Sequence, residues 1–160
     1  MDEMQSFFER AKNAVPTMCF GTDLMVGFPG ETDSDFQETC ESFLSMPFAY
    51  CHVFTFSERT GTPAEKMNEV VPVETRRRRS AQLRRLSSSK RMEFHEKQIG
   101  KTWRVLLENP KEEFYSGYTD HYVRVMVPME SVGLENRMAS VKMLRASPEF
   151  MEGEIVSLES

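Results

Sequence analysis

Residues 20–32 combine an apolar strand, a glycine-rich turn and a helix start, and they constrain the fold more than any other stretch. The unbroken apolar run 24–26 is typical of a strand that is covered on both faces in a parallel sheet. Gly27 and Gly30 permit a close approach of ligand to backbone, and Thr32 can cap the following helix. Since ligands of α/β proteins bind at the carboxyl ends of strands, the turn predicts a ligand-binding loop. Alternatively, it is only a tight connection between strand and helix.

A second strand and a second loop follow. The aromatic and β-branched run 48–56 favours a strand, and the loop 57–64 leaves its carboxyl end on the same rim as the first loop. Together with an amphipathic helix near the N-terminus, this order predicts α/β structure with parallel strands. Arg59 is then a cation on the rim that could clamp a carboxylate or a phosphate. It could equally pair with Glu58 or Glu31.

Composition and cysteine spacing narrow the class of protein. The 160 residues suffice for one domain or two small ones, with a formal net charge of −5. Cys19, Cys40 and Cys51 are too widely spaced for the paired motifs of zinc or iron–sulfur sites, so we expect reduced core cysteines and no metal ligands. No apolar run approaches the ~20 residues that span a bilayer, and the acidic start differs from a signal peptide. These features predict a cytoplasmic protein without a membrane partner.

Basic residues are concentrated in one segment of an acidic chain. The net charge is −8 over residues 1–71, +6 over residues 72–97 and −3 over residues 98–160. The basic segment 72–97 contains nine cations, eight of which lie between residues 76 and 91: Arg76, Arg77, Arg78, Arg79, Arg84, Arg85, Lys90 and Arg91. A polyanion such as RNA should contact the chain there, and we expect four side chains to neutralise phosphates: Arg76, Arg77, Arg84 and Arg85. The alternative is a solvated helix face.

One long helix is predicted to carry this basic segment. It covers residues 70–98, and Gly100 suits its end. Its apolar positions, Leu83, Leu86 and Phe94, form only a thin stripe. Such a stripe predicts a helix that lies on the surface and links two bodies rather than filling a core.

Beyond Gly100 the hydrophobic period changes from about 3.6 residues to 2, which predicts a second body. Five short strand-like segments follow: 102–108, 114–119, 122–127, 140–144 and 154–158. They predict a small closed antiparallel barrel of the OB-like kind. Such barrels commonly bind oligonucleotides through exposed aromatic and cationic side chains, for which Tyr118, Tyr122 and Arg124 are candidates here. Tyr118 could instead be buried in the barrel core.

Five sequence blocks together resemble one protein family. They are GTDLMVGFPGET, HVFTFSERTGTPA, the arginine-rich helix, IGKTWRVLLE and SGYTDHYVRV. In order and spacing they are similar to the C-terminal half of the radical-SAM methylthiotransferases that modify tRNA. The resemblance covers nearly the whole chain. It implies that residues 1–71 are the C-terminal part of a radical-SAM partial barrel, 72–98 a basic linker helix, and 99–160 a TRAM domain, the family's RNA-binding β-barrel.

For the intact enzyme, the resemblance implies cleavage of S-adenosylmethionine, hydrogen abstraction at adenine C2, sulfur insertion and methylation. Seven residues would line the S-adenosylmethionine site: Asp23, Val26, Gly27, Gly30, Phe54, Ser57 and Arg59. No catalytic acid or base is expected, because the radical step needs none. The sequence lacks the CxxxCxxC motif that holds the family's [4Fe–4S] cluster. The resemblance therefore implies a C-terminal fragment that is inactive alone, binds no cofactor tightly and acts with N-terminal domains of the same enzyme.

Several functional interpretations stay open from the sequence alone. The triplet His52-Val53-Phe54 is more like the family branch that acts on threonylcarbamoyl-adenosine in tRNA than the isopentenyl-adenosine branch. A non-catalytic RNA-binding adaptor is a second hypothesis. A third is an unrelated α/β module fused to an OB-like domain, with residues 76–79 docking an acidic protein.

Overall fold

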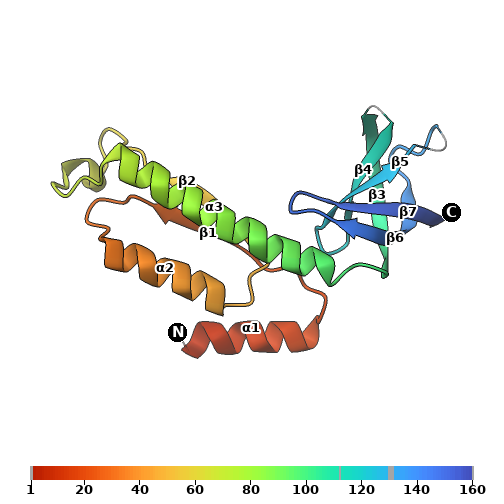
Figure 1. Cartoon of the computed structure of the whole chain (residues 1–160), viewed down its shortest axis with the longest axis horizontal. Coiled ribbons are helices and arrows are strands. Elements are labelled where there is room, and N and C mark those ends of the chain that lie inside the picture. Colours follow the sequence, from red (N-terminus) through yellow and green to blue (C-terminus); the bar gives the residue numbers. More distant parts are fainter. Residues whose placement is uncertain (1, 112, 130–131, 160) are drawn as a thin grey trace. The chain divides into compact units, whose positions relative to one another are not determined.

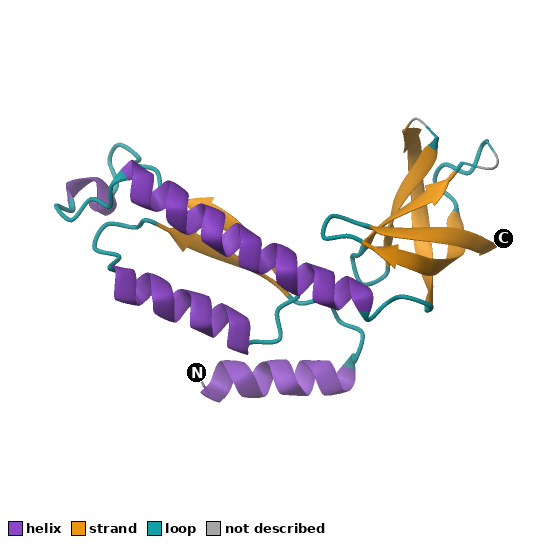
Figure 2. Ribbon diagram, viewed as in Figure 1, coloured by secondary structure: helices purple, strands orange, loops and turns teal. Residues whose placement is uncertain are grey.

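The protein divides into two compact units, each with its own core (Figures 1 and 2). The computed structural model describes residues 2–111, 113–129 and 132–159. The first unit, which we call the α/β unit, comprises residues 2–8 and 20–90. The second, the barrel unit, comprises residues 9–19 and the described residues of 91–159.

Helices and one parallel pair of strands form the first part of the chain (Figure 1). The elements up to residue 96 are α1 (Asp2–Ala14), β1 (Gly21–Val26), α2 (Asp33–Ser45), β2 (Tyr50–Thr55), the 3-10 helix η1 (Pro63–Lys66) and α3 (Val73–Glu96). β1 and β2 pair in parallel, from Gly21 opposite Tyr50 to Val26 opposite Thr55. The two predicted strands are therefore confirmed as parallel neighbours.

The start of α2 is fixed by a capping box that its sequence predicts in part. The Thr32 side chain accepts the Asp35 N–H at 3.1 Å, and Asp35 Oδ2 accepts the Thr32 N–H at 2.9 Å. Two otherwise unpaired backbone donors are thereby satisfied. The buried face of α2 then joins β1 and α3 in a core of buried residues: Val26, Phe36, Cys40 and Leu83.

β1 is not covered on both faces by the described residues, contrary to the prediction. Val26 is fully buried, but Met25 is 54% exposed and its partner on β2, Phe54, is 51% exposed. Successive side chains of a strand point to opposite faces, and the core lies on one face only. Asp23 is on the exposed face together with Met25.

α3 does not lie wholly on the surface, as its thin apolar stripe predicted, but contributes to a core. Leu83 is fully buried in the core of the α/β unit. The same inward face carries polar residues, Arg76, Ser80 and Ser87, all of which are buried. Ser87 Oγ donates to the Cys51 carbonyl at 3.0 Å and accepts the Cys51 N–H at 2.9 Å, which attaches α3 to β2. Hydrophobic periodicity counts apolar residues only, so it could not detect an inward face built largely from arginine and serine.

The barrel unit contains the predicted five-stranded closed barrel. Its strands are β3 (Thr102–Lys111), β4 (Phe114–Thr119), β5 (Arg124–Pro128), β6 (Met138–Ala146) and β7 (Met151–Leu158). They close in the order β3-β4-β5-β7-β6, with β6 pairing back onto β3. The prediction of a wholly antiparallel barrel is wrong at one place, because β5 and β7 pair in parallel. The fifth strand inserts between the third and the fourth, which gives the barrel a Greek-key order.

The barrel core explains why the alternation of apolar and polar residues predicted most strands well. Val105, Leu107, Val125 and Val141 lie inside with almost no exposed surface, each separated from the next inward residue by an outward one. The strand predicted over 122–127 begins only at residue 124. Tyr122 has a φ of 65° and belongs to the preceding turn, and this left-handed conformation ends strand pairing.

One buried and one half-buried histidine, His95 and His121, predict that the barrel loses stability in mild acid. Burial lowers the pKa of His95, whose Nδ1 donates to the Ser147 carbonyl at 2.6 Å, and burial also lowers the pKa of His121. Because the folded state disfavours protonation of these imidazoles, the barrel is most stable above their unfolded-state pKa of about 6.5. This stability is lost as the pH falls from that value through the lowered pKa of the folded state. The melting temperature should therefore drop between pH 7.5 and 5, by roughly 4–8 °C for each kcal/mol lost.

Trp103, the only tryptophan in the chain, lies on β3 and reports barrel unfolding by fluorescence. Replacing both histidines by glutamine should flatten the pH dependence. A His52→Gln variant, altered in the α/β unit, serves as the control. An equally steep dependence in the double variant would contradict the assignment.

Candidate cofactor loops and nucleic-acid interface

Two loops leave the carboxyl ends of β1 and β2 side by side. The strand register continues to Val26 opposite Thr55, and the Phe56 N–H donates to the Val26 carbonyl at 2.8 Å. Gly27 and Gly30 have φ values of 78° and 89°, so both adopt the left-handed conformation that favours glycine. The structure therefore brings the two predicted loops together on one rim.

An exposed face of the β1–β2 pair adjoins these loops. Phe54 and Asp23 lie on it, as do two residues that the sequence did not propose as cofactor contacts: Met25, opposite Phe54, and His52, opposite Asp23. The Phe28 ring contacts Phe56 edge to face, with centroids 5.2 Å apart. Strand alternation counted from buried residues would have identified Met25.

Of the candidate cofactor residues, Val26 has no side-chain access to this face. It is fully buried with Phe36 and Leu83, so only its backbone could contribute to such a site. Ser57 and Arg59 are exposed on the second loop. The acids suggested as partners of Arg59 are paired elsewhere: Glu58 with Arg76, and Glu31 with Arg79.

Two arginines of the basic run lie inside the α/β unit. Arg76 and Arg79 are only 4% and 3% exposed. Arg76 bonds to Glu58, and this hydrogen bond lowers the pKa of the Glu58 carboxyl. Burial alone would lower the pKa of Arg79, but its hydrogen bonds with Asp33 and Glu31 outweigh burial and raise it. Arg76 therefore does not present its guanidinium to RNA, which corrects the expectation for that residue.

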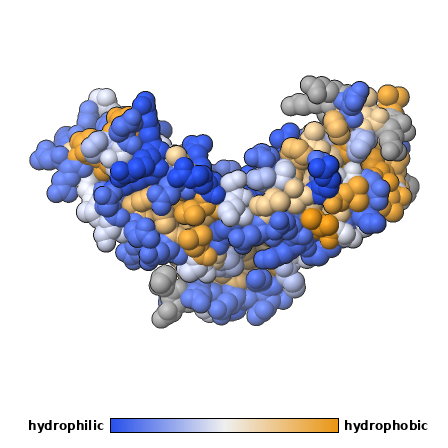
Figure 3. Space-filling view, in the orientation of Figure 1, coloured by the Kyte–Doolittle hydropathy of each residue, from blue (hydrophilic) through white to orange (hydrophobic). Residues whose placement is uncertain are grey.

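The other arginines of α3 face solvent. Arg77 and Arg85 are exposed, and Arg77 has one ion pair, to the exposed Glu74 at 3.7 Å. Arg84 is also exposed, although one of its guanidinium nitrogens donates to the Val53 carbonyl at 3.2 Å. Figure 3 shows hydrophilic residues over much of the α/β unit. Of the four arginines predicted to contact phosphate, the structure thus leaves three exposed.

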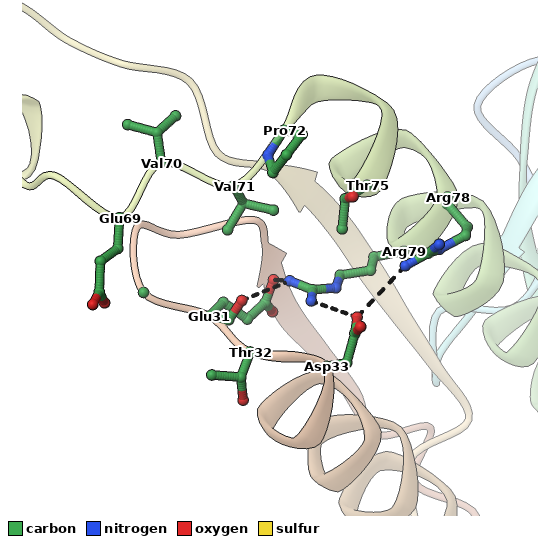
Figure 4. Close-up of a pocket in the computed structure, with 11 residues that line it drawn as sticks. Glu31, Thr32, Asp33, Glu69, Val70, Val71, Pro72, Thr75, Arg78 and Arg79 are labelled. Carbon is green, nitrogen blue, oxygen red and sulfur yellow. Dashed lines mark hydrogen bonds and ion pairs between the residues drawn. The ribbon is translucent and has the colours of Figure 1, made fainter.

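A pocket of about 440 Å³ lies beside the first loop and the start of α3 (Figure 4). Its wall includes Glu31 and Asp33 from the loop side and Thr75, Arg78 and Arg79 from α3. The carboxylates and the guanidiniums face one another across its floor, where Arg79 pairs with both acids. Its charges are therefore largely satisfied by one another.

The barrel presents a stacked aromatic pair next to a cation. The rings of Tyr118 and Tyr122 are stacked, with centroids 4.8 Å apart and planes 24° apart, and Tyr122 is 70% exposed. Arg124 on β5 is the register partner of Tyr118 on β4. Tyr115, not Tyr118, fills the barrel core on this strand. The three barrel residues proposed from the sequence are thus neighbours on adjoining strands and the turn between them.

The residues that the structure describes form neither a metal-binding cluster nor a membrane-spanning helix. Their histidines, cysteines and acids nowhere gather in a group of three that could hold a metal ion. None of their helices combines the length and apolar character that crossing a membrane requires. Burial raises the pKa of the Cys19 thiol to about 11, and burial likewise raises the pKa of Cys40.

These features define an α/β protein with glycine-containing loops at the carboxyl ends of parallel strands, joined to a small closed five-stranded barrel with an OB-like strand order. No protein-family model matches the chain. It is 35% identical over 123 residues to the tRNA-2-methylthio-N(6)-dimethylallyladenosine synthase of Desulfitobacterium hafniense, which covers 75% of this chain and 28% of that protein. It is 31% identical over 161 residues to the threonylcarbamoyladenosine tRNA methylthiotransferase of Bacillus subtilis, covering 96% of this chain and 36% of that protein.

A third relative, the threonylcarbamoyladenosine tRNA methylthiotransferase of Aquifex aeolicus, is 38% identical over 105 residues, or 66% of this chain and 26% of its own length. The relatives are thus tRNA methylthiotransferases, which confirms the resemblance found in the sequence blocks. The chain spans about a third of the length of the relatives that it matches.

Proposed function

We propose that this chain is part of an enzyme that adds a methylthio group at C2 of N6-threonylcarbamoyladenosine in tRNA. The observation that carries the proposal is the match over 96% of the chain to a threonylcarbamoyladenosine tRNA methylthiotransferase. In this assignment residues 1–71 are the C-terminal part of a radical-SAM partial barrel, 72–98 a basic linker helix and 99–160 a TRAM domain. The parallel β1–β2 pair is compatible with the first of these domains, and the closed barrel is compatible with the last.

The chemical groups of S-adenosylmethionine match those on the exposed face of the β1–β2 pair and on the adjoining loops. Exposed Met25 and Phe54 offer apolar surface for an adenine ring, and the Gly27 and Gly30 loop allows backbone contacts. Arg59 would hold a carboxylate, and Asp23 or Ser57 a hydroxyl or an ammonium group. In the intact enzyme S-adenosylmethionine would supply the radical and the methyl group, with [4Fe–4S] clusters held by N-terminal domains of the same protein. By itself this chain would be inactive.

RNA binding is assigned to the outward face of α3 and to the Tyr118–Tyr122 pair. If Arg77, Arg84 and Arg85 each neutralise a phosphate, their joint replacement by glutamine should flatten the salt dependence of tRNA binding, by roughly 0.7–0.9 in the log–log slope for each phosphate that is no longer neutralised. A Tyr118→Ala change should instead weaken binding by about 1–3 kcal/mol at an unchanged slope, because only a stacking interaction is removed. Binding titrations at several salt concentrations measure both effects.

Matched variants separate specific contacts from general effects. Replacing exposed Lys12, Arg137 and Arg145 by glutamine removes the same charge elsewhere and should leave the slope nearly unchanged. Tyr118→Phe retains the ring and should retain affinity. An unchanged slope in the folded Arg77, Arg84 and Arg85 variant would refute the assignment of α3 to RNA.

A second candidate substrate is the isopentenyl-type adenosine. The 35% identity to a dimethylallyladenosine synthase favours it, and the His52-Val53-Phe54 triplet favours the threonylcarbamoyl nucleoside. Expression of the full-length gene in cells lacking both activities, followed by mass analysis of tRNA nucleosides, decides between them. Methylthiolation of the dimethylallyl nucleoside alone would overturn the first choice.

A further inference from the structure

α3 reaches both rim loops through its two buried arginines. Arg79 extends to the loop after β1, and Arg76 extends to the segment after β2. Both side chains are almost completely shielded from solvent, whereas Arg77 and Arg78 between them are exposed. The four successive arginines are therefore two pairs with different environments.

Arg79 is the link to the first loop (Figure 4). One terminal nitrogen donates to Glu31 Oε2 at 2.6 Å and to the Glu31 carbonyl at 3.0 Å, and the other donates to Asp33 Oδ1 at 2.7 Å. Its guanidinium also lies over the Phe36 ring, 5.4 Å from the centroid. This planar fork joins the end of the loop to the first turn of α2.

Glu31 transmits the contact to the loop backbone. The same Oε2 that accepts from Arg79 also accepts the Gly27 N–H at 2.6 Å. The Gly27 backbone, in its left-handed conformation, is therefore held by a carboxylate whose position Arg79 fixes. Without Arg79 this carboxylate would be a largely shielded charge with no cation beside it, because the Glu31 side chain is only 12% exposed.

Arg76 is the link to the second loop. It donates to the Val71 carbonyl at 2.8 Å and to the Phe56 carbonyl at 3.0 Å, and it pairs with Glu58. Its aliphatic stem packs directly on Gly27, where an added Cβ would clash with it. One side chain thus contacts the ends of both strands.

We infer that Arg76 and Arg79 are positioning residues that hold the two rim loops in their ligand-competent arrangement before any ligand is bound. The assignment of the ligand rests on the proposed function, but the holding of the loops does not. The basic run of α3 then has two separate tasks: its inward arginines order the rim, and its outward arginines remain available for phosphate.

Amide hydrogen exchange on this chain without cofactor tests the inference. In Arg79→Gln, the Gly27 amide should exchange at least about a hundredfold faster, because removal of one partner of a buried pair frees the loop. In Arg76→Gln the Phe56 amide should respond in the same way. The Cys51 amide, fixed by Ser87 inside the unit, should keep its protection in both variants.

Conservative and neighbouring variants make the outcome decisive. Arg78→Gln removes only an exposed pair to Asp33 at 3.5 Å and should leave Gly27 unchanged. Arg79→Lys keeps the charge without the fork, so it should fold even if Arg79→Gln does not, and its Gly27 amide should still exchange faster than in the unmodified chain. Full protection of Gly27 in Arg79→Lys, or an equal loss of protection at Gly27 and Cys51, would overturn the inference. Because no ligand is added, a failed tRNA assignment would leave this result unaffected.

Discussion

Replacement of Leu83 by alanine is expected to unfold the α/β unit at 37 °C while the β-barrel remains folded. Leu83 is completely buried where α3 meets β1 and α2, in contact with Val26, Phe36 and Cys40. A buried leucine-to-alanine change costs about 2–5 kcal/mol, because it removes apolar contacts and leaves a cavity. The core of this unit is small, so the loss is a large fraction of its stability.

Circular dichroism and Trp103 fluorescence separate the two units in one experiment. Most helical residues belong to the α/β unit, and Trp103 belongs to the barrel. The helical signal should melt at a much lower temperature in Leu83→Ala, and the fluorescence transition should move little. Val73→Ala, on the same helix at a 59% exposed position, is the control and should change stability by no more than about 0.5 kcal/mol. Equal melting curves for the two variants would show that α3 is not part of the core.

Gly117→Ala should have the opposite effect, a destabilised barrel beside an intact α/β unit. A Cβ at Gly117 would clash with the Leu106 carbonyl oxygen and lie 2.7 Å from Val105 Cγ1. The obstructing oxygen belongs to the backbone of β3, whose residue Leu107 is paired with Gly117. It cannot withdraw without weakening strand pairing, so we expect a cost near the upper end of the ~1–3 kcal/mol typical of overpacked sites.

In Gly117→Ala, the melting temperature of the barrel, followed by Trp103 fluorescence, should be lower by roughly 10–20 °C. Each kcal/mol of lost stability corresponds to about 4–8 °C in a domain of this size. Gly100→Ala is the comparison variant. Gly100 has a φ of 80° with open space around it, so alanine there introduces backbone strain without a clash. A smaller effect at Gly117 than at Gly100 would contradict the steric explanation.

The elements that the sequence predicted best are those whose burial follows a simple period. The capped start of α2 and the five barrel strands combine helical spacing or apolar alternation with turn residues. The parallel β5–β7 pair could not be predicted, because alternation within a strand says nothing about the direction of its neighbour.

The candidate site was predicted at the level of loops but not of side chains. The sequence indicated that Gly27, Ser57 and Arg59 lie on loops at the same end of the parallel strands. It also led to the prediction that Arg76 is a surface cation. Charge runs are normally solvated, and nothing local distinguishes Arg76 from Arg77. Only tertiary contacts with Glu58 and the Phe56 carbonyl separate them.

The barrel order also determines when this unit can fold. β7 lies between β5 and β6, so neither of those strands is fully paired until residues 151–158 are available. Pairing of β3 with β6 also joins residues 32 to 40 positions apart, so loop-closure entropy is lost before these contacts form. During synthesis β5 and β6 should each keep one unpaired edge until β7 has left the ribosome. The folding rate of the barrel therefore depends on β7, the last of its strands in the sequence. The barrel should be most prone to aggregation in the interval before β7 is available.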